Sequence, residues 1–265
     1  MTRQRSGRNP CTARARRTAA LLVATSLAAV AGVRVSAADD TPGAAKLLQD
    51  SDRSRGGLQA GITWTIKVES VENDDRTESQ YVVKARGNDA YAEAIAPARI
   101  KGETYLFNDR TIWYYKPGLR SPVSLSTRQR LTGQAANGDI ASTNYARDYD
   151  GSVVGRDKIG GEETYKLELK AKASSVTYDR IRYWVSVSRT QAVKAEFLTA
   201  KGSVFKIATF AYGNKVSVEG VEYDFVSRMT IADAAFPKNV TVLSYSSIHA
   251  EKHPDSIFNV NNLVR

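Results

Sequence analysis

Three side chains near the C-terminal end have the types and the spacing of a metal site. In the stretch His249-Ala-Glu-Lys-His253, two histidines and Glu251 occupy alternate positions. On an extended strand they would share one face, where imidazole and carboxylate groups can coordinate a metal ion. The order differs from the His-Glu-x-x-His motif of metalloproteases, because the acid stands at the third position. We therefore interpret the stretch as a solvated strand end before Pro254 and predict no metal ligands.

Other motifs that could carry chemistry are incomplete. The stretch Asp148-Tyr149-Asp150-Gly151 begins like a calcium loop but lacks the third ligand and the later glutamate. The pairs Glu162-Glu163 and Asp74-Asp75 are sequence neighbours, so on a strand the side chains of each pair point to opposite faces and do not converge. The sequence has no nucleophile elbow, phosphate loop or dinucleotide fingerprint. We predict no catalytic residues and no cofactor, and we expect that the protein is not an enzyme.

The aromatic residues of this chain are more informative about its function than its acidic residues. It contains 13 tyrosines and three tryptophans. Such side chains combine an apolar body with a polar tip, which suits the lining or the rim of a lipid pocket. They suit the packed core of a β protein equally well, and both interpretations stay open for any single residue.

The first 37 residues have the pattern of a secretory signal peptide. Arg14, Arg16 and Arg17 precede an apolar run over 19–33, and small residues follow at Ser36 to Ala38. The run is shorter than the roughly 20 apolar residues of a membrane helix. We expect ordinary secretion with cleavage after residue 37 or 38, which leaves one domain over 38–265.

Removal of this signal peptide would change both the cysteine content and the net charge of the protein. The only cysteine, Cys11, lies before the apolar run, so the exported chain would have neither a lipidation site nor a disulfide. The formal net charge is +10, but seven arginines and no acid lie within the first 37 residues, which leaves about +3 on the exported part. A concentrated basic face is therefore not expected, and we predict no nucleic-acid partner.

Most of the chain after Gly57 alternates between apolar and polar residues. The clearest row is Ile62, Trp64, Ile66 and Val68, separated by polar residues, as in a half-buried antiparallel strand. Further strands are expected over 81–86, 90–96, 104–107, 111–115, 165–170, 181–187, 193–199, 204–212, 223–231 and 239–247. About ten such strands predict one strongly curved sheet, because a flat sheet of that width leaves a large apolar face uncovered.

Two segments interrupt the strands. A helix is predicted over 41–53, with Thr41 as its N-cap and an apolar stripe that includes Leu47 and Leu48. This helix would cover a sheet edge or act as a lid over a pocket. The polar segment over 116–149 is longer than most loops, and it has room for at most a short helix near 134–143. We predict that residues 126–144 are more mobile than the strands and help to gate a pocket.

The stretch from Ala90 to Asn144 resembles the LolA-like group of outer-membrane lipoprotein-sorting proteins. The likeness continues through 178–185 and 193–197 to the tail at 254–258, so it covers most of the chain after residue 60. The matching residues are Pro97, Lys101-Gly102, Tyr105-Leu106-Phe107, Trp113-Tyr114-Tyr115, Lys116-Pro117, Arg128-Gln129-Arg130-Leu131, Gly138-Asp139-Ile140 and Asn144-Tyr145.

The resemblance implies an α+β fold that is mainly antiparallel β: a curved, incomplete β-barrel, or half-barrel, with a few lid helices. The residues by themselves leave a closed, lipocalin-like barrel open as an alternative. The implied function is that of a periplasmic carrier, which binds the acyl chains of lipoproteins or other lipids in an apolar cavity for transfer toward the outer membrane. Its implied partners are these acyl chains, an inner-membrane transporter and an outer-membrane acceptor.

Candidate site residues follow from the strand pattern and the resemblance. We expect lipid-binding side chains at Ile62, Trp64, Ile66, Val68, Tyr81, Val83, Tyr105, Phe107 and Trp113. In LolA-like carriers an arginine on an early strand holds the lid, and Arg86 stands at a comparable place. Two other functions stay open, an accessory subunit of an inner-membrane lipid transporter that moves no cargo and a hydrolase with the curved sheet as its cleft.

Overall fold

The computed structural model describes residues 41–108, 110–141 and 143–264. The signal peptide predicted over 1–37 lies outside the described residues. Among the described helices, none combines the length and the apolar character that a membrane span requires.

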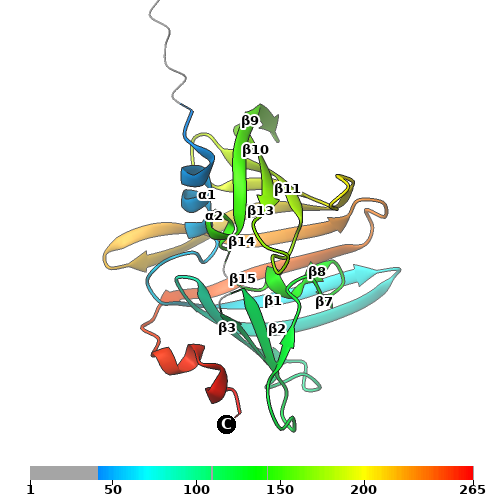
Figure 1. Ribbon diagram of the computed structural model, residues 1–265, viewed down its shortest axis with the longest axis vertical. Coiled ribbons are helices and arrows are strands. Elements are labelled where there is room, and N and C mark those ends of the chain that lie inside the picture. The colour runs from blue at the N-terminus through cyan, green and yellow to red at the C-terminus, as the bar shows by residue number, and fades with distance from the viewer. Residues whose placement is uncertain (1–40, 109, 142, 265) are drawn as a thin grey trace, which may run out of the picture. The chain divides into compact units, whose positions relative to one another are not determined.

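One antiparallel sheet of thirteen strands forms most of the described chain (Figure 1). Its strands are β1 Ile62–Glu72, β2 Asp75–Arg86, β3 Asp89–Ala96, β4 Thr104–Asn108, β5 Thr111–Tyr115, β6 Val123–Leu125, β9 Tyr149–Ile159, β10 Glu162–Ala171, β11 Arg180–Ser186, β12 Ala192–Leu198, β13 Val204–Val218, β14 Val221–Asp233 and β15 Val240–Ala250. This sheet confirms the prediction of a mainly antiparallel β fold.

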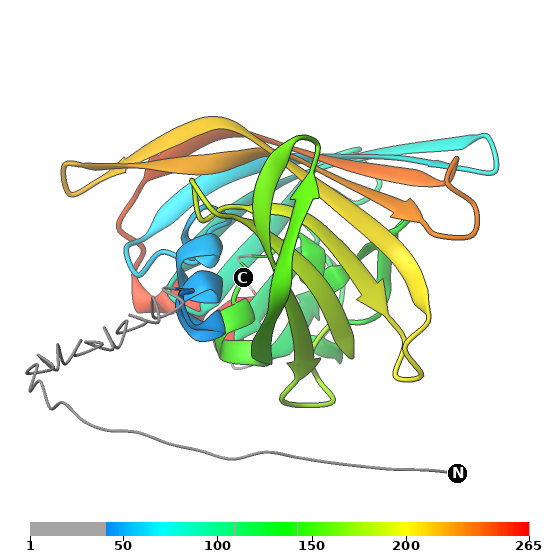
Figure 2. The ribbon, with the colours of Figure 1, turned by 90° about the horizontal axis from the view of Figure 1, so that it is seen from above.

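The strand order shows why the sheet is an open half-barrel. Each strand pairs with its neighbours in sequence, except at the centre, where β1 pairs with β15. Two meanders therefore extend in opposite directions from this central pair and end at β6 and β9, which are the edges of the sheet. Figure 2 shows the resulting curvature. Because its edges do not join, the sheet is not the closed barrel that the sequence left open.

Side-chain alternation places the core on the concave face. In β1 the buried residues Ile62, Trp64, Ile66 and Val68 alternate with more exposed ones from Thr65 onward. The register continues this face into the neighbouring strands, since Ile66 lies opposite Tyr81 on β2 and Tyr245 on β15. Each side chain of this size contributes about 1.5–3 kcal/mol when it is fully buried.

The remaining elements lie outside the large sheet. They are α1 Ala44–Arg53, the hairpin of β7 Arg130–Thr132 and β8 Ala135–Ala136, η1 Asn137–Asp139, α2 Tyr145–Asp148, η2 Asp255–Phe258 and η3 Val260–Asn262. The predicted helix near the start of the domain begins at Ala44 rather than at Thr41. Gly43 is its N-cap, and the Gly43 carbonyl accepts the amides of Lys46 and Leu47.

The polar segment over 116–149 is more structured than the sequence indicated. It contains β6, β7, β8, η1 and α2, and β9 begins at Tyr149. Strand β9 was not predicted, because nearly all its side chains are exposed and show no apolar alternation. It pairs only with β10, as an edge strand.

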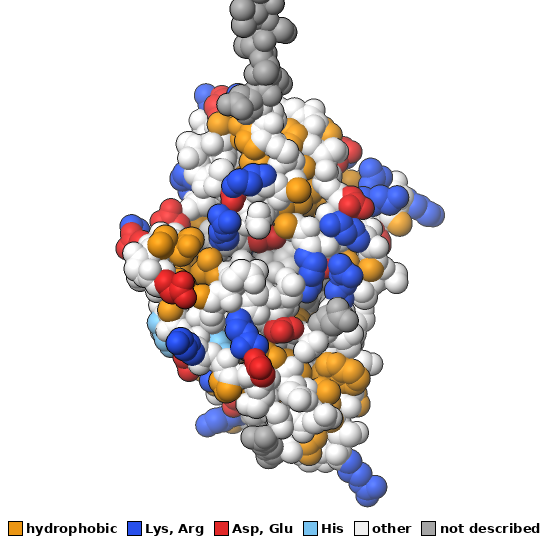
Figure 3. Space-filling view, turned by 60° about the vertical axis from the view of Figure 1, so that its left-hand side comes forward, with side chains coloured by type: hydrophobic (Ala, Val, Ile, Leu, Met, Phe, Trp, Pro, Cys, Tyr) orange, Lys and Arg blue, Asp and Glu red, His pale blue; other side chains and the backbone are white. Residues whose placement is uncertain are grey.

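A second apolar cluster covers part of the convex face. Leu106 on β4 is fully buried there against Phe258 and Leu263 of the C-terminal segment, and Trp113 packs against the same cluster. The helices η2 and η3 therefore cover the convex side of β3 to β5. Elsewhere the surface carries mixed charges, and Figure 3 shows acidic and basic side chains interspersed on one face of the molecule.

Candidate functional site

The concave face gathers almost all the side chains that the sequence assigned to a pocket. Ile62, Trp64, Ile66 and Val68 are each at most 1% exposed. Tyr81, Val83, Tyr105 and Phe107 are buried in the same apolar cluster. The hairpin formed by β4 and β5 also brings Ile112 and Tyr114 to this face, opposite Phe107 and Tyr105.

Trp113 does not belong to this face. It lies opposite Leu106 on β4, and both side chains point to the convex side. The reason is the two-residue period of a strand: Ile112 and Tyr114 point inward, so the residue between them points outward. The prediction that grouped Trp113 with the inward residues is corrected accordingly.

The concave face is covered by a segment of the chain that we call the plug segment, residues 126–148. It contributes three apolar side chains, Ala135, Ala136 and Ile140, that are at most 2% exposed. These are more apolar anchors than the polar composition of the segment indicated. Next to it, α1 buries Leu47 and Leu48 and packs against α2 and β9 (Figure 1).

One end of the plug segment is attached to the centre of the sheet. The amide of Gln134 donates to Thr241 Oγ1 at 2.7 Å, and this hydroxyl donates to Ser70 Oγ at 3.1 Å. Ser70 and Thr241 are buried cross-strand partners on β1 and β15. We call the contact of Gly133 and Gln134 with Ser70 and Thr241 the hairpin contact. Beside it, Arg130 forms an ion pair with Glu72 at 2.9 Å.

The plug segment is also attached to the loop before β11. Arg128 Nε donates to the carbonyl of Val176 at 2.8 Å, and Arg128 forms an ion pair with Asp179 at 2.7 Å. The hydroxyl of Tyr178 donates to Asp139 Oδ2 at 2.8 Å. The segment thus crosses from the central strands to the β9–β11 side of the half-barrel, and its contacts at both ends are mainly polar.

A buried carboxylate joins α1 to α2. Asp52 Oδ2 accepts the amide of Ala146 at 2.9 Å, while its other oxygen is buried without a protein partner. Burial raises the pKa of Asp52 to about 7, although the hydrogen bond from Ala146 and the charge of Arg55 oppose this rise. The contact between the two helices therefore contains a group that titrates near neutral pH.

A small cavity lies between the concave face of the sheet and the plug segment. It has a volume of about 60 Å³ and is lined by Phe107 and Ile112 of the sheet, Gly138 and Ala141 of the plug segment, and Val176. Ligand pockets usually measure about 300–1,000 Å³. An acyl chain therefore fits under the plug segment only if that segment moves.

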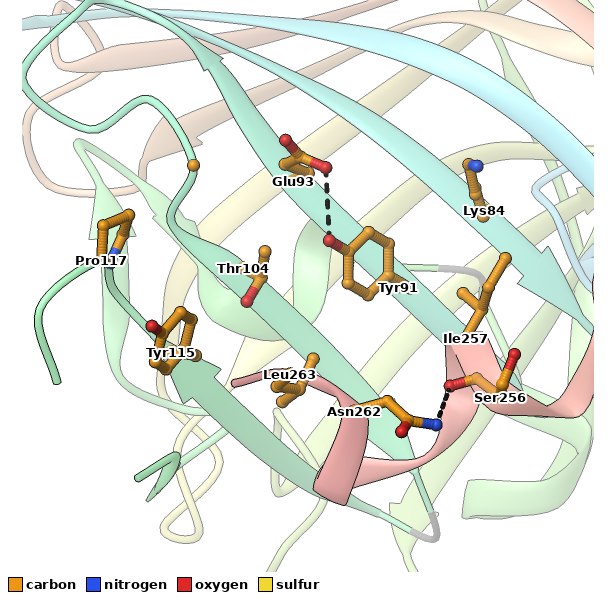
Figure 4. A pocket seen from close by; sticks show the side chains of 11 residues that line it. Lys84, Tyr91, Glu93, Thr104, Tyr115, Pro117, Ser256, Ile257, Asn262 and Leu263 are labelled. Atoms are coloured by element: carbon orange, nitrogen blue, oxygen red, sulfur yellow. Dashed lines mark hydrogen bonds between the residues drawn. The ribbon is translucent and has the colours of Figure 1, made fainter. Parts of the chain in front are cut away.

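A larger cavity of about 490 Å³ lies on the convex face, between β2 to β5 and the C-terminal helices (Figure 4). Tyr91 donates its hydroxyl to Glu93 at 3.2 Å within it. The hydroxyl of Thr104 is buried at this cavity without a protein partner. The lining mixes charged, polar and apolar side chains, unlike the apolar concave face.

Arg86 does not contact the plug segment in this structure. It forms an ion pair with Asp255 at 2.7 Å, donates to the carbonyl of His253 at 3.0 Å and lies 5.1 Å from the ring centre of Phe258. Its place follows from alternation, because Val83 and Ala85 on the same strand point inward. Arg86 therefore holds the C-terminal segment. Two other arginines contact the plug segment: Arg110 forms an ion pair with Asp148 at 2.9 Å, and the guanidinium of Arg55 lies 5.3 Å from the ring centre of Tyr145. Sequence reasoning treated Arg55 only as part of a helix end.

The histidines near the C-terminus form no metal site. No cluster of three or more potential ligands occurs among the residues that the structure describes. His249 is exposed, as expected for a solvated strand end. His253 is only 5% exposed, and its Nε2 lies 3.1 Å from the carbonyl of Ile62, so the prediction was wrong for this residue. Glu251 accepts a hydrogen bond from Thr63 at 2.6 Å.

Comparisons with known proteins agree with this fold. A family model described as "Uncharacterized protein" matches residues 87–265. The LolA superfamily protein NE2245 from Nitrosomonas europaea is 31% identical with a TM-score of 0.74, and the match covers 83% of this chain and 99% of that one. No curated protein matches the chain.

Two further solved structures share the fold at lower identity. A domain assigned as an outer membrane lipoprotein-sorting protein from Vibrio parahaemolyticus is 18% identical with a TM-score of 0.70, covering 83% of this chain and 98% of that one. A DUF1329 family protein from Desulfovibrio piger is 19% identical with a TM-score of 0.67, covering 83% and 97%.

Proposed function

The chain belongs to the LolA superfamily, and from that premise we propose that it is a periplasmic carrier that holds the acyl chains of a lipid or lipoprotein against its concave face. The observation that carries the proposal is how this face is covered. Its apolar side chains form one buried cluster with Ala135 and Ile140 of the plug segment, which is attached at both ends by mainly polar contacts. Such a cover can be exchanged for a ligand.

The energies involved are compatible with this exchange. Burial of an acyl chain of about sixteen carbons contributes on the order of 12 kcal/mol, at about 0.8 kcal/mol per methylene, before association costs. Each hydrogen bond of the plug segment to the sheet contributes only about 0.5–1.5 kcal/mol net. A lipid that fills the concave face can therefore offset the loss of several hydrogen bonds of the plug segment.

The cellular role that we propose rests on the family. We propose that the exported protein takes its cargo from an inner-membrane transporter and delivers it to an outer-membrane acceptor, as the description of a related structure as a lipoprotein-sorting domain suggests. The carrier role needs no reacting group. This agrees with a concave face lined by apolar and aromatic side chains.

The test combines native cargo with designed variants. Lipid extracted from the purified mature protein is identified by mass spectrometry, and acyl-chain binding is measured by displacement of a fluorescent fatty acid. Ile66→Asp places a carboxylate on the concave face and is expected to abolish binding. Ile66→Ala removes contact area without adding charge and is expected to weaken binding only in part.

The matched control is Ser246→Asp, which adds the same charge on an exposed position of β15. It is expected to leave lipid binding unchanged. Equal effects of Ile66→Asp and Ser246→Asp on folded variants would contradict the proposal. A lipid-free protein that forms a stable complex with a transporter would instead support an accessory subunit, and turnover of a lipid ester would support a hydrolase.

A further inference from the structure

Arg55 is a buried cation that no carboxylate pairs with. It follows α1 and is only 8% exposed. None of the ion pairs among residues 41–108, 110–141 and 143–264 includes it. A guanidinium stays charged under all ordinary conditions, and an unpaired charge is costly to bury. A group that compensates this charge is therefore expected in the working protein.

The neighbours of Arg55 are mostly aromatic rings. Its guanidinium carbon lies 4.3 Å from the ring centre of Phe210 and 5.3 Å from that of Tyr145. One terminal nitrogen donates to the hydroxyl of Tyr183 at 3.2 Å, and the other approaches the sulfur of Met229 at 4.0 Å. A guanidinium has five N–H donors, so the hydroxyls of Tyr183 and Tyr145 and one weak sulfur acceptor leave some of them unused.

Other buried donors lie on the concave face. The indole nitrogen of Trp64 is buried without a hydrogen bond in the described part of the protein, and the buried hydroxyl of Tyr212 interacts with the side chain of Ser54. Tyr212 follows Phe210 on the same face of β13 and interacts electrostatically with Arg55. Trp64 packs against Phe225 at 5.6 Å between ring centres. These groups donate hydrogen bonds, so together with Arg55 they favour a ligand that accepts them.

Two carboxyl groups interact with Arg55 at longer range, but each has other partners. Asp52 accepts the amide of Ala146, and Asp139 accepts the amide of Ala136 and the hydroxyl of Tyr178. Burial raises the pKa of both carboxyl groups, and that of Asp52 rises to about 7, so Asp52 is a weak counter-charge below that pH.

We propose that Arg55 binds an anionic group, a carboxylate or a phosphate, at the polar end of the acyl cargo. This inference rests on the proposed carrier function and narrows it to anionic lipids. Tyr145, which lies on α2 within the plug segment, covers the guanidinium, so displacement of that segment opens Arg55 to the concave face. The acyl chain then lies along the apolar strands while its charged end meets the guanidinium, and a neutral acyl ester gains only the first of these contacts.

The experiment compares ligands that differ in charge but share the same chain. Displacement of the neutral dye N-phenyl-1-naphthylamine from the mature protein is measured at pH 6, where Asp52 is mostly protonated, with palmitate against methyl palmitate, and with hexadecyl phosphate against hexadecanol. Wild type is expected to bind the anionic member of at least one pair about tenfold more tightly, as one charged hydrogen bond confers. The pair that shows the preference distinguishes a carboxylate cargo from a phosphate cargo.

Variants assign the preference to one residue. Arg55→Met keeps an apolar side chain of similar length and is expected to bind charged and neutral ligands equally, while Arg55→Lys is expected to retain part of the preference. The control is Arg86→Met, since Arg86 lies on the convex side, and it is expected to keep the full preference. Circular dichroism and thermal melting establish that each variant is folded.

Three outcomes would overturn the inference. Equal affinity of wild type for the members of both pairs, or a preference that persists in Arg55→Met, would refute the anion site and leave the carrier function standing. Failure of the wild type to bind any of the four ligands would refute the carrier function and the anion site together.

Discussion

The substitution Gly133→Ala is expected to release the plug segment from the sheet. Gly133 has a φ of +49°, and a Cβ added there would lie 1.8 Å from Ser70 Oγ and 2.4 Å from Thr241 Oγ1. Both hydroxyls belong to buried residues of the central strands. The hairpin contact therefore cannot form around an alanine without moving either the sheet or the hairpin, and the hairpin is the less anchored of the two.

The change in the free energy of opening the plug segment follows from the backbone strain and from the hydrogen bonds that the closed state loses. A residue with a Cβ in this left-handed conformation costs about 1–2 kcal/mol. The clash also removes from the closed state the bond from the Gln134 amide to Thr241 and the bond from Lys206 to the Gln134 carbonyl, each worth about 1 kcal/mol net, and the open state lacks both bonds in either protein. Together these terms lower the free energy of opening by about 3 kcal/mol, which corresponds to about a hundredfold change in the opening equilibrium.

The assay is amide hydrogen exchange, read by mass spectrometry over the plug segment. Exchange in residues 126–148 is expected to rise about a hundredfold in Gly133→Ala, with little change in β1 and β15. Lipid uptake is expected to be faster than in wild type. The control is Gly118→Ala, because Gly118 has a φ of +97° but its added Cβ meets no atom within 4 Å. It carries backbone strain without the clash.

The result that refutes this reasoning is an equal exchange rate in the two variants. In that case the hairpin contact does not hold the plug segment closed. Faster exchange without any change in lipid uptake would refute the gating role predicted for residues 126–144 while leaving the hairpin contact intact.

Two more predictions concern the contact between α1 and α2 and the attachment of the C-terminal segment. The carboxyl of Asp52 has a pKa of about 7 in the fold against 3.8 as its ordinary value, so the folded state binds this proton more tightly and stability falls as pH rises between those values. Asp52→Asn is expected to remove this loss, with no gain at pH 4 and up to about 4 kcal/mol at pH 8 in denaturant unfolding; an equal gain at both pH values would contradict the assignment. Arg86→Ala is expected to loosen the C-terminal segment and red-shift the fluorescence of Trp113, at a cost of about 1–2 kcal/mol. Lipid affinity should stay unchanged, whereas reduced affinity would favour the lid role that the family resemblance implied for Arg86.

Local sequence patterns were sufficient to predict a strand and its inward face wherever one face of the strand is buried and the other is exposed to solvent. The row from Ile62 to Val68 shows this, because each inward position is apolar and the strand period is two residues. Strand β9 lacks that signal, since it is an edge strand with exposed side chains on both faces. The plug segment lacked it too, because its anchors are three small or isolated apolar residues within a polar stretch.

The sequence by itself determined the strands that have one buried and one exposed face, and it left open how the curved sheet would be covered. Alternation, a local property of the backbone, also puts Arg86 on the face opposite to Val83. The tertiary structure alone decided that Arg55 meets the plug segment and which rings surround its guanidinium. Arg55 and Tyr183 are 128 positions apart and become neighbours at 3.2 Å only because the sheet curves and α1 packs inside the curve. Curvature depends on the summed twist of all thirteen strands, so no single stretch of sequence contains that contact.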